Sequence, residues 1–467
     1  MKLLLKDGNV INPLNKTINI QDILIVDGKV AAIGRELAAS LDLDLDLDLD
    51  LSRSTGGTGF QPGGTGFQPV VFNDEETIED ACPTISVINA KGKYVVPGLI
   101  DMHVHLREPG FEEKETIATG TQAAARGGFT GIVCMPNTEP PADNQAVISF
   151  IQQVAQKTGV VNVFPVGTIT QGRAGKELSE MASLAAQGAV AFSDDGAPVV
   201  NAKLMRHAME YAKMLDLPVI SHCEEPALAA QGMMHEGFTS TMLGLPGIPA
   251  AAEEVMVARD IILANLTGCH LHIAHVSTAG SVELVRAAKE KGIKVTCEVT
   301  PHHFTLTDEA VSSYDPQTKV NPPLRSKADV VALQAGLKDG TIDVIATDHA
   351  PHTQEEKELE FELAPFGMVG LETAVGLVWT KLVIPGILTS CEAVAKMTVN
   401  PARILNLKKG LIEIGAEADI TVIDPELTCV IKPEEFASKG RNTPFSGWSL
   451  KGLPVATIVG GEVKWIK

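Results

Sequence analysis

Positive charge is scarce in this chain of 467 residues. Lysine and arginine together number 38, against 58 aspartates and glutamates, which gives a formal net charge of -20 at pH 7. A surface of that sign repels phosphates instead of neutralising them, so the composition argues against a nucleic-acid interface. A small anionic substrate stays compatible with the composition, because it needs only a local cationic group.

Paired cysteines and long apolar runs are also lacking. The seven cysteines include no CxxC pair and are odd in number, which is typical of reduced thiols in a cytosol and not of a disulfide framework. The apolar start at Met1–Leu5 meets Lys6 and Asp7 at once, so no signal peptide is expected. No uncharged apolar stretch is long enough to cross a bilayer. We therefore expect a soluble cytoplasmic protein without a membrane or nucleic-acid partner.

What the chain does contain is a series of eight apolar runs between Tyr94 and His352, separated by helical stretches. Such alternation predicts a parallel sheet covered by helices, and eight repeats predict a closed (β/α)8 barrel of the TIM type. With 45% hydrophobic residues, the chain can build this barrel and one smaller domain. The expected fold class is therefore α/β, with the barrel over residues 95–395.

Both ends of the chain show short strands and turns instead. Residues 1–36, 85–93 and the part beyond Pro401 have this character, with Asp27-Gly28 as a strong hairpin signal. We expect the two ends, 1–94 and 396–467, to form one small β-sandwich domain.

A low-complexity stretch interrupts the N-terminal part. Leu41–Leu51 alternates leucine and aspartate, and Gly-Gly-Thr-Gly-Phe-Gln-Pro then occurs twice, at 56–62 and 63–69. Five aspartates on one face oppose a strand, and the Gly- and Pro-rich repeat cannot support a core. Residues 38–84 are interpreted as a flexible surface insertion without a catalytic role.

Nearly every apolar run ends in side chains that bind metals or substrates. The ends read Asp101-Met-His-Val-His105, Cys134-Met-Pro-Asn137, Phe192-Ser-Asp-Asp195, Ser221-His-Cys-Glu224, Ala274-His-Val-Ser277, Thr300-Pro-His-His303 and Ala346-Thr-Asp-His-Ala-Pro-His352. Only the run near Thr170 lacks such a group. Because a closed barrel carries its chemistry at the carboxyl ends of its strands, the pattern predicts a metal-centred active site.

His103 and His105 are the first candidate ligands. Two residues apart on a strand, their side chains leave the same face and can chelate one cation. That spacing is weak by itself, but His222, His275 and Asp348 close later strands in the same way. Imidazoles and carboxylates at several strand ends suit Zn²⁺ or a similar metal.

Asp194 and Asp195 close the fourth run, and either could bridge two metals. The run contains no lysine, which makes a carbamylated lysine an improbable bridge. Two-residue alternation does not choose between the aspartates, because the end of a strand can bulge.

Four further histidines receive less specific interpretations. His270 and His272 have the opposite parity to His275, so both should face the helices. His302 and His303 close the seventh strand, where a place behind the metal ligands and a purely structural place are both open.

Together these motifs resemble the amidohydrolase superfamily and, within it, the bacterial class I dihydroorotases. The resemblance covers almost the whole chain except the insertion. The motifs that carry it are Val96-Pro-Gly-Leu-Ile-Asp-Met-His-Val-His-Leu-Arg-Glu-Pro-Gly110, Met135-Pro-Asn-Thr138, Ser193-Asp-Asp-Gly196, Ser221-His-Cys-Glu-Glu225, Ala274-His-Val-Ser-Thr278, Val299-Thr-Pro-His-His303, Val320-Asn-Pro-Pro-Leu-Arg325, Thr347-Asp-His-Ala-Pro-His352 and Asn442-Thr-Pro-Phe-Ser-Gly447.

The resemblance implies a set of site residues. One metal would be bound by His103, His105 and Asp348 and a second by His222 and His275, with Asp195 shared between them. The implied cofactor is Zn²⁺, one or two per subunit, and Asp348 is the implied catalytic residue. The implied substrate contacts are His105, Arg107, Asn137, Asn321, His352, Phe366 and Gly367.

The implied reaction is the reversible hydrolysis of (S)-dihydroorotate to N-carbamoyl-L-aspartate by a metal-bound hydroxide, in de novo pyrimidine (UMP) biosynthesis. Arg107 would hold the substrate carboxylate through two parallel hydrogen bonds. A homo-oligomer and an association with aspartate transcarbamoylase are further expectations. We also hypothesise that the acidic segment Thr353–Pro365 is part of a mobile cover over the site.

Two other functions stay open on the sequence. A related cyclic amidase (hydantoinase, dihydropyrimidinase or allantoinase) would share the fold, but the missing lysine and the cluster of Arg107, Asn137 and Asn321 favour a substrate with a carboxylate. A non-catalytic scaffold for aspartate transcarbamoylase would be free to lose ligands, whereas all six implied positions are occupied here.

Overall fold

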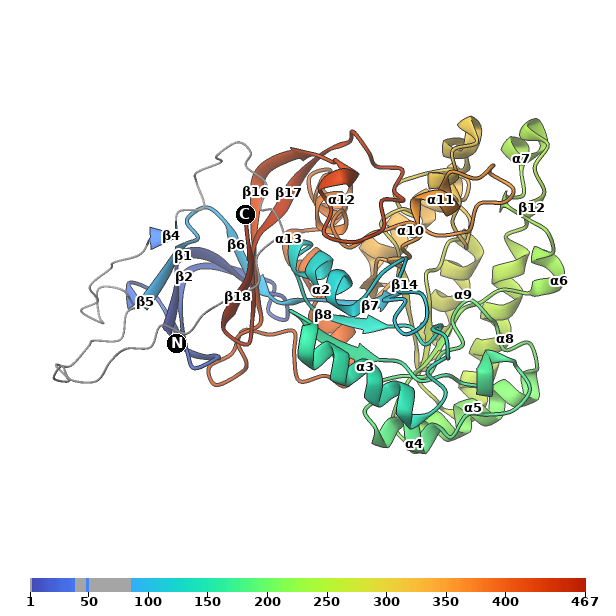
Figure 1. The fold of residues 1–467 in the computed structure, drawn as a ribbon, viewed down its shortest axis with the longest axis horizontal. Coiled ribbons are helices and arrows are strands. Elements are labelled where there is room, and N and C mark those ends of the chain that lie inside the picture. Colours follow the sequence, from blue (N-terminus) through green and yellow to red (C-terminus); the bar gives the residue numbers. More distant parts are fainter. Residues whose placement is uncertain (1, 38–47, 50–84) are drawn as a thin grey trace.

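The computed structural model describes residues 2–37, 48–49 and 85–467, which form a barrel next to a domain rich in β-strands (Figure 1). The insertion predicted at 38–84 lies outside the described residues except for β4 (Asp48–Leu49), which pairs with β5 (Ile85–Asn89). Within the described ranges, no helix combines the length and the apolar character needed to cross a membrane.

The small domain is built from both ends of the chain. Its further strands are β1 (Lys2–Asn12), β2 (Thr17–Val26), β3 (Lys29–Gly34), β6 (Tyr94–Pro97), β16 (Ile420–Val430), β17 (Ser449–Val459) and β18 (Glu462–Ile466). The described strands run in the order β18-β17-β16-β6-β1-β2-β3, so antiparallel pairing of β6 with β16 joins the two ends. The β2–β3 turn at Asp27 and Gly28 has positive φ at both residues, as a tight hairpin requires.

Eight strand positions close the barrel. The strands are β7 (Leu99–Val104), β8 (Phe129–Cys134), β9 (Asn162–Pro165), β10 (Val219–Ser221), β13 (Leu271–Ile273), β14 (Val295–Val299) and β15 (Val344–Ile345). The fourth position is a single residue, Phe192, which bridges in parallel to Gly167 after β9 and to Val219 on β10. A parallel bridge between Val104 and His349 closes the ring, which confirms the predicted α/β barrel class.

Helices surround this ring (Figure 1). They are α2 (Ile117–Arg126), α3 (Gln145–Thr158), α4 (Met181–Ala186), α5 (Ala202–Met214), α8 (Ala251–Thr267), α9 (Ala279–Glu290), α10 (Lys327–Asp339), α12 (Ala374–Val378), α13 (Ser390–Lys396) and α14 (Val399–Ile404). Three short helices, α6 (Pro226–Ala229), α7 (Phe238–Leu243) and α11 (Gln354–Lys357), lie in the loops that follow strands, and β11 (Met234–His235) pairs there with β12 (Gly247–Ile248).

Two apolar cores hold the barrel together. Leu271 and Ile273 belong to the large core between strands and helices, whereas Met102, Val133 and Ile220 fill the inside of the ring. Ile404 of α14 also packs into the inner core, although it lies beyond the boundary predicted at 395. The boundaries at 95 and 395 stay predictions.

Helix α2 begins later than the sequence indicates. The alanine-rich stretch predicts a helix from Glu112, but the helix starts at Ile117 because Thr116 caps it. The Thr116 hydroxyl accepts a hydrogen bond from Thr119 N, and the Thr119 hydroxyl accepts one from Thr116 N. The stop at Gly127 is where the sequence places it.

Candidate metal centre

Six side chains from five strand positions meet at the carboxyl ends of the barrel strands. They are His103 on β7, His105 just after it, Asp195 after the fourth position, His222 after β10, His275 after β13 and Asp348 after β15. All six are buried. The arrangement follows from the fold, because parallel strands in a closed barrel deliver their ends to one rim.

Asp195 lies at the middle of the group. Its Oδ1 is 3.3 Å from His103 Nε2 and 3.8 Å from both His222 Nδ1 and His275 Nε2. Its Oδ2 is 3.6 Å from His105 Nε2. One carboxylate therefore faces both halves of the cluster, as a bridge between two cations would.

Asp348 completes the other side. Its Oδ1 is 3.0 Å from His105 Nε2 and 3.6 Å from His103 Nε2. Across the site, His222 Nδ1 and His275 Nε2 are 2.9 Å apart. Two imidazole nitrogens this close suit a shared cation or a shared proton.

The residues present fit a metal. In the described part of the chain, His103, Asp195 and His275 offer ligand atoms within 4.8 Å of one another, and so do His103, His105 and Asp348. His103 Nε2 and Asp195 Oδ1 are buried without a hydrogen-bond partner, although they lie 3.3 Å apart. Such unpaired polar atoms are costly in a protein interior, and a cation bound between them would satisfy both.

The electrostatics of the cluster are those of a ligand set. Burial would raise the pKa of Asp195, but the charge of His103 and the nearby imidazoles outweigh it and hold that pKa well below its usual range. The pKa of Asp348 is lowered in the same way, burial being outweighed by His103 and His105. Both carboxylates are therefore ionised at neutral pH, which is the form that binds a metal.

Three residues at this rim have a strained backbone. His275, Asp348 and Arg107 all have positive φ, at 32°, 49° and 62°. A left-handed conformation costs a non-glycine residue roughly 1–2 kcal/mol, so the surrounding structure must hold each one in place. Such outliers gather at functional sites more often than elsewhere.

A buried carboxylate that the sequence motifs did not indicate lies behind these imidazoles. Glu298 Oε1 accepts from His103 Nδ1 at 2.6 Å and from the backbone N of His275 at 3.2 Å, and Oε2 lies 3.2 Å from His272 Nε2. Burial would raise the pKa of Glu298, but His103 and His272 lower it to about 2. The available signal was an acidic residue inside strand β14, Val295–Val299, whose other residues carry no charge.

The prediction that His272 faces the helices is wrong. His272 is fully buried on the side opposite Leu271 and Ile273, which belong to the outer core, and it contacts Glu298. Strand β13 ends at Ile273 and His275 has positive φ, so alternation does not continue from His272 to His275.

The structure also separates the two aspartates. Asp194 accepts hydrogen bonds from Ile169 N at 2.8 Å and from Thr170 N at 3.0 Å, which ties two loops together away from the cluster. Asp195, and not Asp194, is therefore the residue that the structure places among the imidazoles.

His303 lies in a separate set of contacts. It bonds to Thr300 Oγ1 at 2.7 Å and to the Pro322 carbonyl at 2.9 Å.

A cavity of about 260 Å³ opens beside the cluster. Its lining includes all the substrate contacts that the resemblance implies: His105, Arg107, Asn137, Asn321, His352, Phe366 and Gly367. Arg107 Nε donates to the Pro351 carbonyl at 3.2 Å, and Asn321 Nδ2 donates to Glu224 at 2.8 Å. Burial lowers the pKa of Arg107, but the nearby carboxylates favour its charged form. The cavity therefore presents one fixed positive charge next to the ligand set.

Comparisons with known proteins agree with this site. A family model described as Dihydro-orotase-like matches residues 92–281, and one described as Amidohydrolase family matches 367–464. A dihydroorotase of Pelotomaculum thermopropionicum is 60% identical over 99% of this chain and 98% of its own length. A dihydroorotase of a Thermoanaerobacter species is 57% identical over 82% of this chain and 88% of its own.

Solved structures share the fold. An L-hydantoinase (dihydropyrimidinase) from Arthrobacter aurescens superimposes with a TM-score of 0.81 at 25% identity, covering 99% of this chain and 95% of that one. A dihydropyrimidinase from Brevibacillus agri gives 0.79 at 23% identity, over 99% and 95%. High identity over nearly the full length, together with the ligand set on the barrel rim, shows that the chain belongs to the dihydroorotase family of metal-dependent cyclic amidohydrolases.

Proposed function

We propose that this protein catalyses the reversible hydrolysis of (S)-dihydroorotate to N-carbamoyl-L-aspartate, a step of de novo pyrimidine biosynthesis. The observation that carries the proposal is the cavity, which five of the six cluster residues line together with Arg107 and two asparagines. A cyclic amide with a carboxylate substituent needs both parts of this cavity. The cluster would act on the ring, and Arg107 with the asparagines would bind the carboxylate.

His103, His105, Asp195, His222, His275 and Asp348 would hold one or two Zn²⁺ ions. When bound, such a metal lowers the pKa of a water to about 7 and polarises the substrate carbonyl. Imidazole and carboxylate ligands in a buried site are the donor set that Zn²⁺ prefers.

Asp348 is the residue that moves the proton. Its lowered pKa keeps it ionised, so it can accept a proton during attack on the amide carbon and return it to the departing ring nitrogen. We assign the proton to Oδ2, because the imidazoles of His103 and His105 both approach Oδ1. In the synthetic direction the same transfers run in reverse.

Arg107 would orient the substrate. Its guanidinium offers parallel donors to a carboxylate, and its bond to the Pro351 carbonyl uses only Nε. Asn137 is held by His105 Nδ1, which lies 2.9 Å from its Oδ1. This contact leaves His105 Nε2 to face the metal cluster.

The direct test measures turnover and metal together. Purified protein should form N-carbamoyl-L-aspartate from dihydroorotate, lose this activity on chelation, and regain it when Zn²⁺ is restored. Asp348→Asn should lower kcat by about 10²–10⁴, the range for a lost general base. Unchanged turnover in that variant would exclude the mechanism.

A cyclic amidase with another substrate is the alternative that the test must separate. Hydantoin and dihydrouracil lack the carboxylate that Arg107 would bind. Faster turnover of hydantoin than of dihydroorotate would favour that alternative.

The wider setting of the protein is also part of the proposal. The described cysteines are free, and five of the six are buried, which supports a reducing cytoplasm. A homo-oligomer and an association with aspartate transcarbamoylase follow from the family resemblance. Size-exclusion chromatography with and without that partner tests both.

A further inference from the structure

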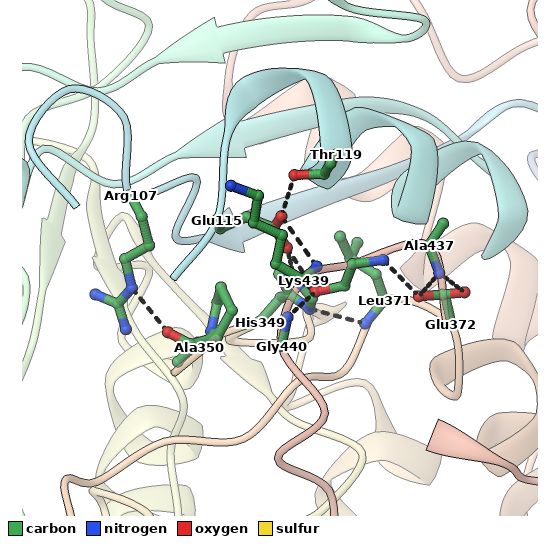
Figure 2. A network of polar contacts seen from close by, with 12 residues as sticks. Arg107, Glu115, Thr119, His349, Ala350, Leu371, Glu372, Ala437, Lys439 and Gly440 are labelled. Carbon is green, nitrogen blue, oxygen red and sulfur yellow. Dashed lines mark hydrogen bonds and ion pairs between the residues drawn. The ribbon is translucent and has the colours of Figure 1, made fainter. Parts of the chain in front are cut away.

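Residues 437–442, here named the strap, leave the small domain after β16 and reach the mouth of the barrel before the chain returns to β17. Two buried carboxylates anchor the strap (Figure 2). Ser438 Oγ donates to Glu115 Oε2 at 2.5 Å, and the backbone N of Ala437 donates to Glu372 at 3.0 Å. The strap is therefore a fixed part of the barrel mouth.

Asn442, at the end of the strap, joins two loops that follow β15. Its Nδ2 donates to the carbonyls of Ala350 at 2.9 Å and Gly367 at 3.1 Å, while its Oδ1 accepts from His352 N at 3.1 Å. Its own carbonyl accepts from Val369 N at 2.8 Å. The side chain is buried, with only 2% of the residue exposed. One amide group thus links residues 350–352 to residues 366–369.

These two loops carry much of the substrate cavity. His352 and Gly367 line the cavity directly, and the Pro351 carbonyl between Ala350 and His352 accepts the hydrogen bond from Arg107 Nε. The position of the guanidinium therefore depends on the same loop that Asn442 holds.

The metal ligands are held by other bonds. Asp348 is close in sequence to Ala350, but the barrel fixes it on both sides: His105 N donates to the His349 carbonyl at 2.9 Å, and Thr347 N donates to Asp101 at 3.1 Å. Loss of the Asn442 amide would loosen the substrate loops and leave the ligand set in place.

We propose that Asn442 is a positioning residue that sets substrate affinity by holding the loops at 350–352 and 366–369 against each other. The inference rests on the proposed function, because it concerns the residues that would bind dihydroorotate. Asn442 belongs to the C-terminal part of the chain that also forms the small domain, so that part helps to hold the loops that line the substrate cavity of the barrel.

The test compares Asn442→Ala with Asn442→Asp. The first removes all three side-chain hydrogen bonds, and the second keeps an acceptor for His352 N but loses both donations to carbonyls. We expect KM for dihydroorotate to rise at least tenfold in both, with kcat within threefold of the wild type, because the lost interactions act on bound substrate and transition state alike. Bound zinc per chain should not change, and amide hydrogen exchange at Gly367 and Val369 should accelerate.

Asn162→Ala is the matched control. Asn162 Nδ2 also donates two hydrogen bonds, to the Thr130 carbonyl at 2.9 Å and to Asp419 at 3.1 Å, and it lies at the first residue of β9, away from the site. Its variant should keep the wild-type KM and the wild-type exchange at Gly367.

If Asn442→Ala does not fold, Gly440→Ala tests the same inference. A Cβ at Gly440 would lie 2.7 Å from both Pro351 Cβ and Val369 Cγ1, so it pushes the strap away from the same loops. A KM within twofold of the wild type in the folded variants overturns the inference. A wild-type protein that does not turn over dihydroorotate would instead overturn the proposed function.

Discussion

Glu298 sets the direction in which His103 presents its ring. Its carboxylate accepts from His103 Nδ1 at 2.6 Å, so the other ring nitrogen, Nε2, points to Asp195 and Asp348. A carboxylate that accepts a hydrogen bond from the second ring nitrogen of a metal-binding histidine typically raises metal affinity 10- to 100-fold. We expect Glu298→Gln to weaken zinc binding by about that factor, measured by competition with a chromophoric chelator, and to recover turnover when zinc is in excess.

Asp22→Asn is the control for this change. Asp22 is also a buried carboxylate, but it accepts from the backbone of Asp7 and Leu37 in the small domain. Its variant should bind zinc as the wild type does. Equal zinc affinity in Glu298→Gln and the wild type would show that His103 is oriented by other contacts.

Arg107 is the residue on which we propose that substrate choice depends. A lysine at this position keeps the charge but cannot make two parallel hydrogen bonds to a carboxylate. We expect Arg107→Lys to raise KM for dihydroorotate about 10- to 100-fold, the equivalent of roughly 1.5–3 kcal/mol for a hydrogen bond to a charged group. Steady-state kinetics measure this change in KM.

The matched control replaces a guanidinium that lies on the surface. Arg286 contacts Asp339 through both Nε, at 3.2 Å, and the terminal nitrogen, at 2.9 Å. Arg286→Lys should leave KM unchanged. A KM for Arg107→Lys no higher than that of this control would mean that the substrate carboxylate is bound elsewhere.

At this scale, the sequence predicts residues that sit at strand ends better than residues inside strands. The ends of the runs point to His105, His222 and Asp348 because polar side chains are conspicuous there. Glu298 could not be assigned, because its role depends on the closed barrel bringing β14 close to His103 on β7, a strand with which β14 does not pair. Which of two adjacent aspartates faces the cluster also depended on the backbone and not on alternation.

At the scale of elements, the segment after β15 is held by the Nζ atoms of two buried lysines. Lys357 Nζ donates to the carbonyls of Pro365 at 2.9 Å and Gly367 at 3.0 Å, and Lys319 Nζ donates to those of Phe361 at 2.7 Å and Glu362 at 2.9 Å. The mobile cover proposed for 353–365 stays a prediction, but a movement of the whole segment must break the three hydrogen bonds that join it to Lys319 and Gly367. The acidic composition of the segment did not indicate them.

Lys357 should make the stability of this segment depend on pH. Burial, together with the charge of Lys319, lowers the pKa of Lys357 from 10.5 to about 7. Between these values the unfolded chain binds the proton and the folded chain does not, so stability rises with pH across that window. Relative to Lys357→Met, the wild type should gain up to about 3 kcal/mol between pH 7 and pH 9, since each pH unit is worth about 1.4 kcal/mol.

Urea unfolding of both proteins at pH 6.5, 8 and 9 measures this difference. Lys338→Met serves as the control, because Lys338 is an exposed lysine of α10. A difference between Lys357→Met and the wild type that stays constant over these pH values would contradict the prediction.

At the scale of the whole molecule, the sequence predicts the architecture because its signals are repeated. Eight apolar runs give the ring, and the short strands at both ends give one domain, since β6 and β16 can only satisfy their edges by pairing. The sequence predicts the limits of individual strands and helices less well. The fourth barrel position is a single bridging residue, Phe192, and α2 starts at its Thr116 cap instead of at Glu112.

The six side chains of the proposed metal site also link the barrel around its circumference, so metal should stabilise the whole fold. They come from β7, from the position after Phe192, and from the ends of β10, β13 and β15. An ion that binds only the folded state stabilises that state by about 4 kcal/mol when its concentration is a thousand times Kd. Calorimetry should therefore show a lower Tm after chelation, and the Tm should return when zinc is added.

The comparison of two histidine variants makes this prediction specific. His222→Ala removes a cluster imidazole and should reduce the gain in Tm that zinc produces. His270→Ala removes a half-buried imidazole that bonds to Thr296 Oγ1 at 2.9 Å, outside the cluster, and should keep the full gain. If zinc raises the Tm of both variants as much as that of the wild type, the stabilising ion binds elsewhere and the barrel rim does not depend on it. If chelation leaves the wild-type Tm unchanged, the buried cluster is stable without a cation, and the unpaired atoms of His103 and Asp195 must be satisfied by solvent.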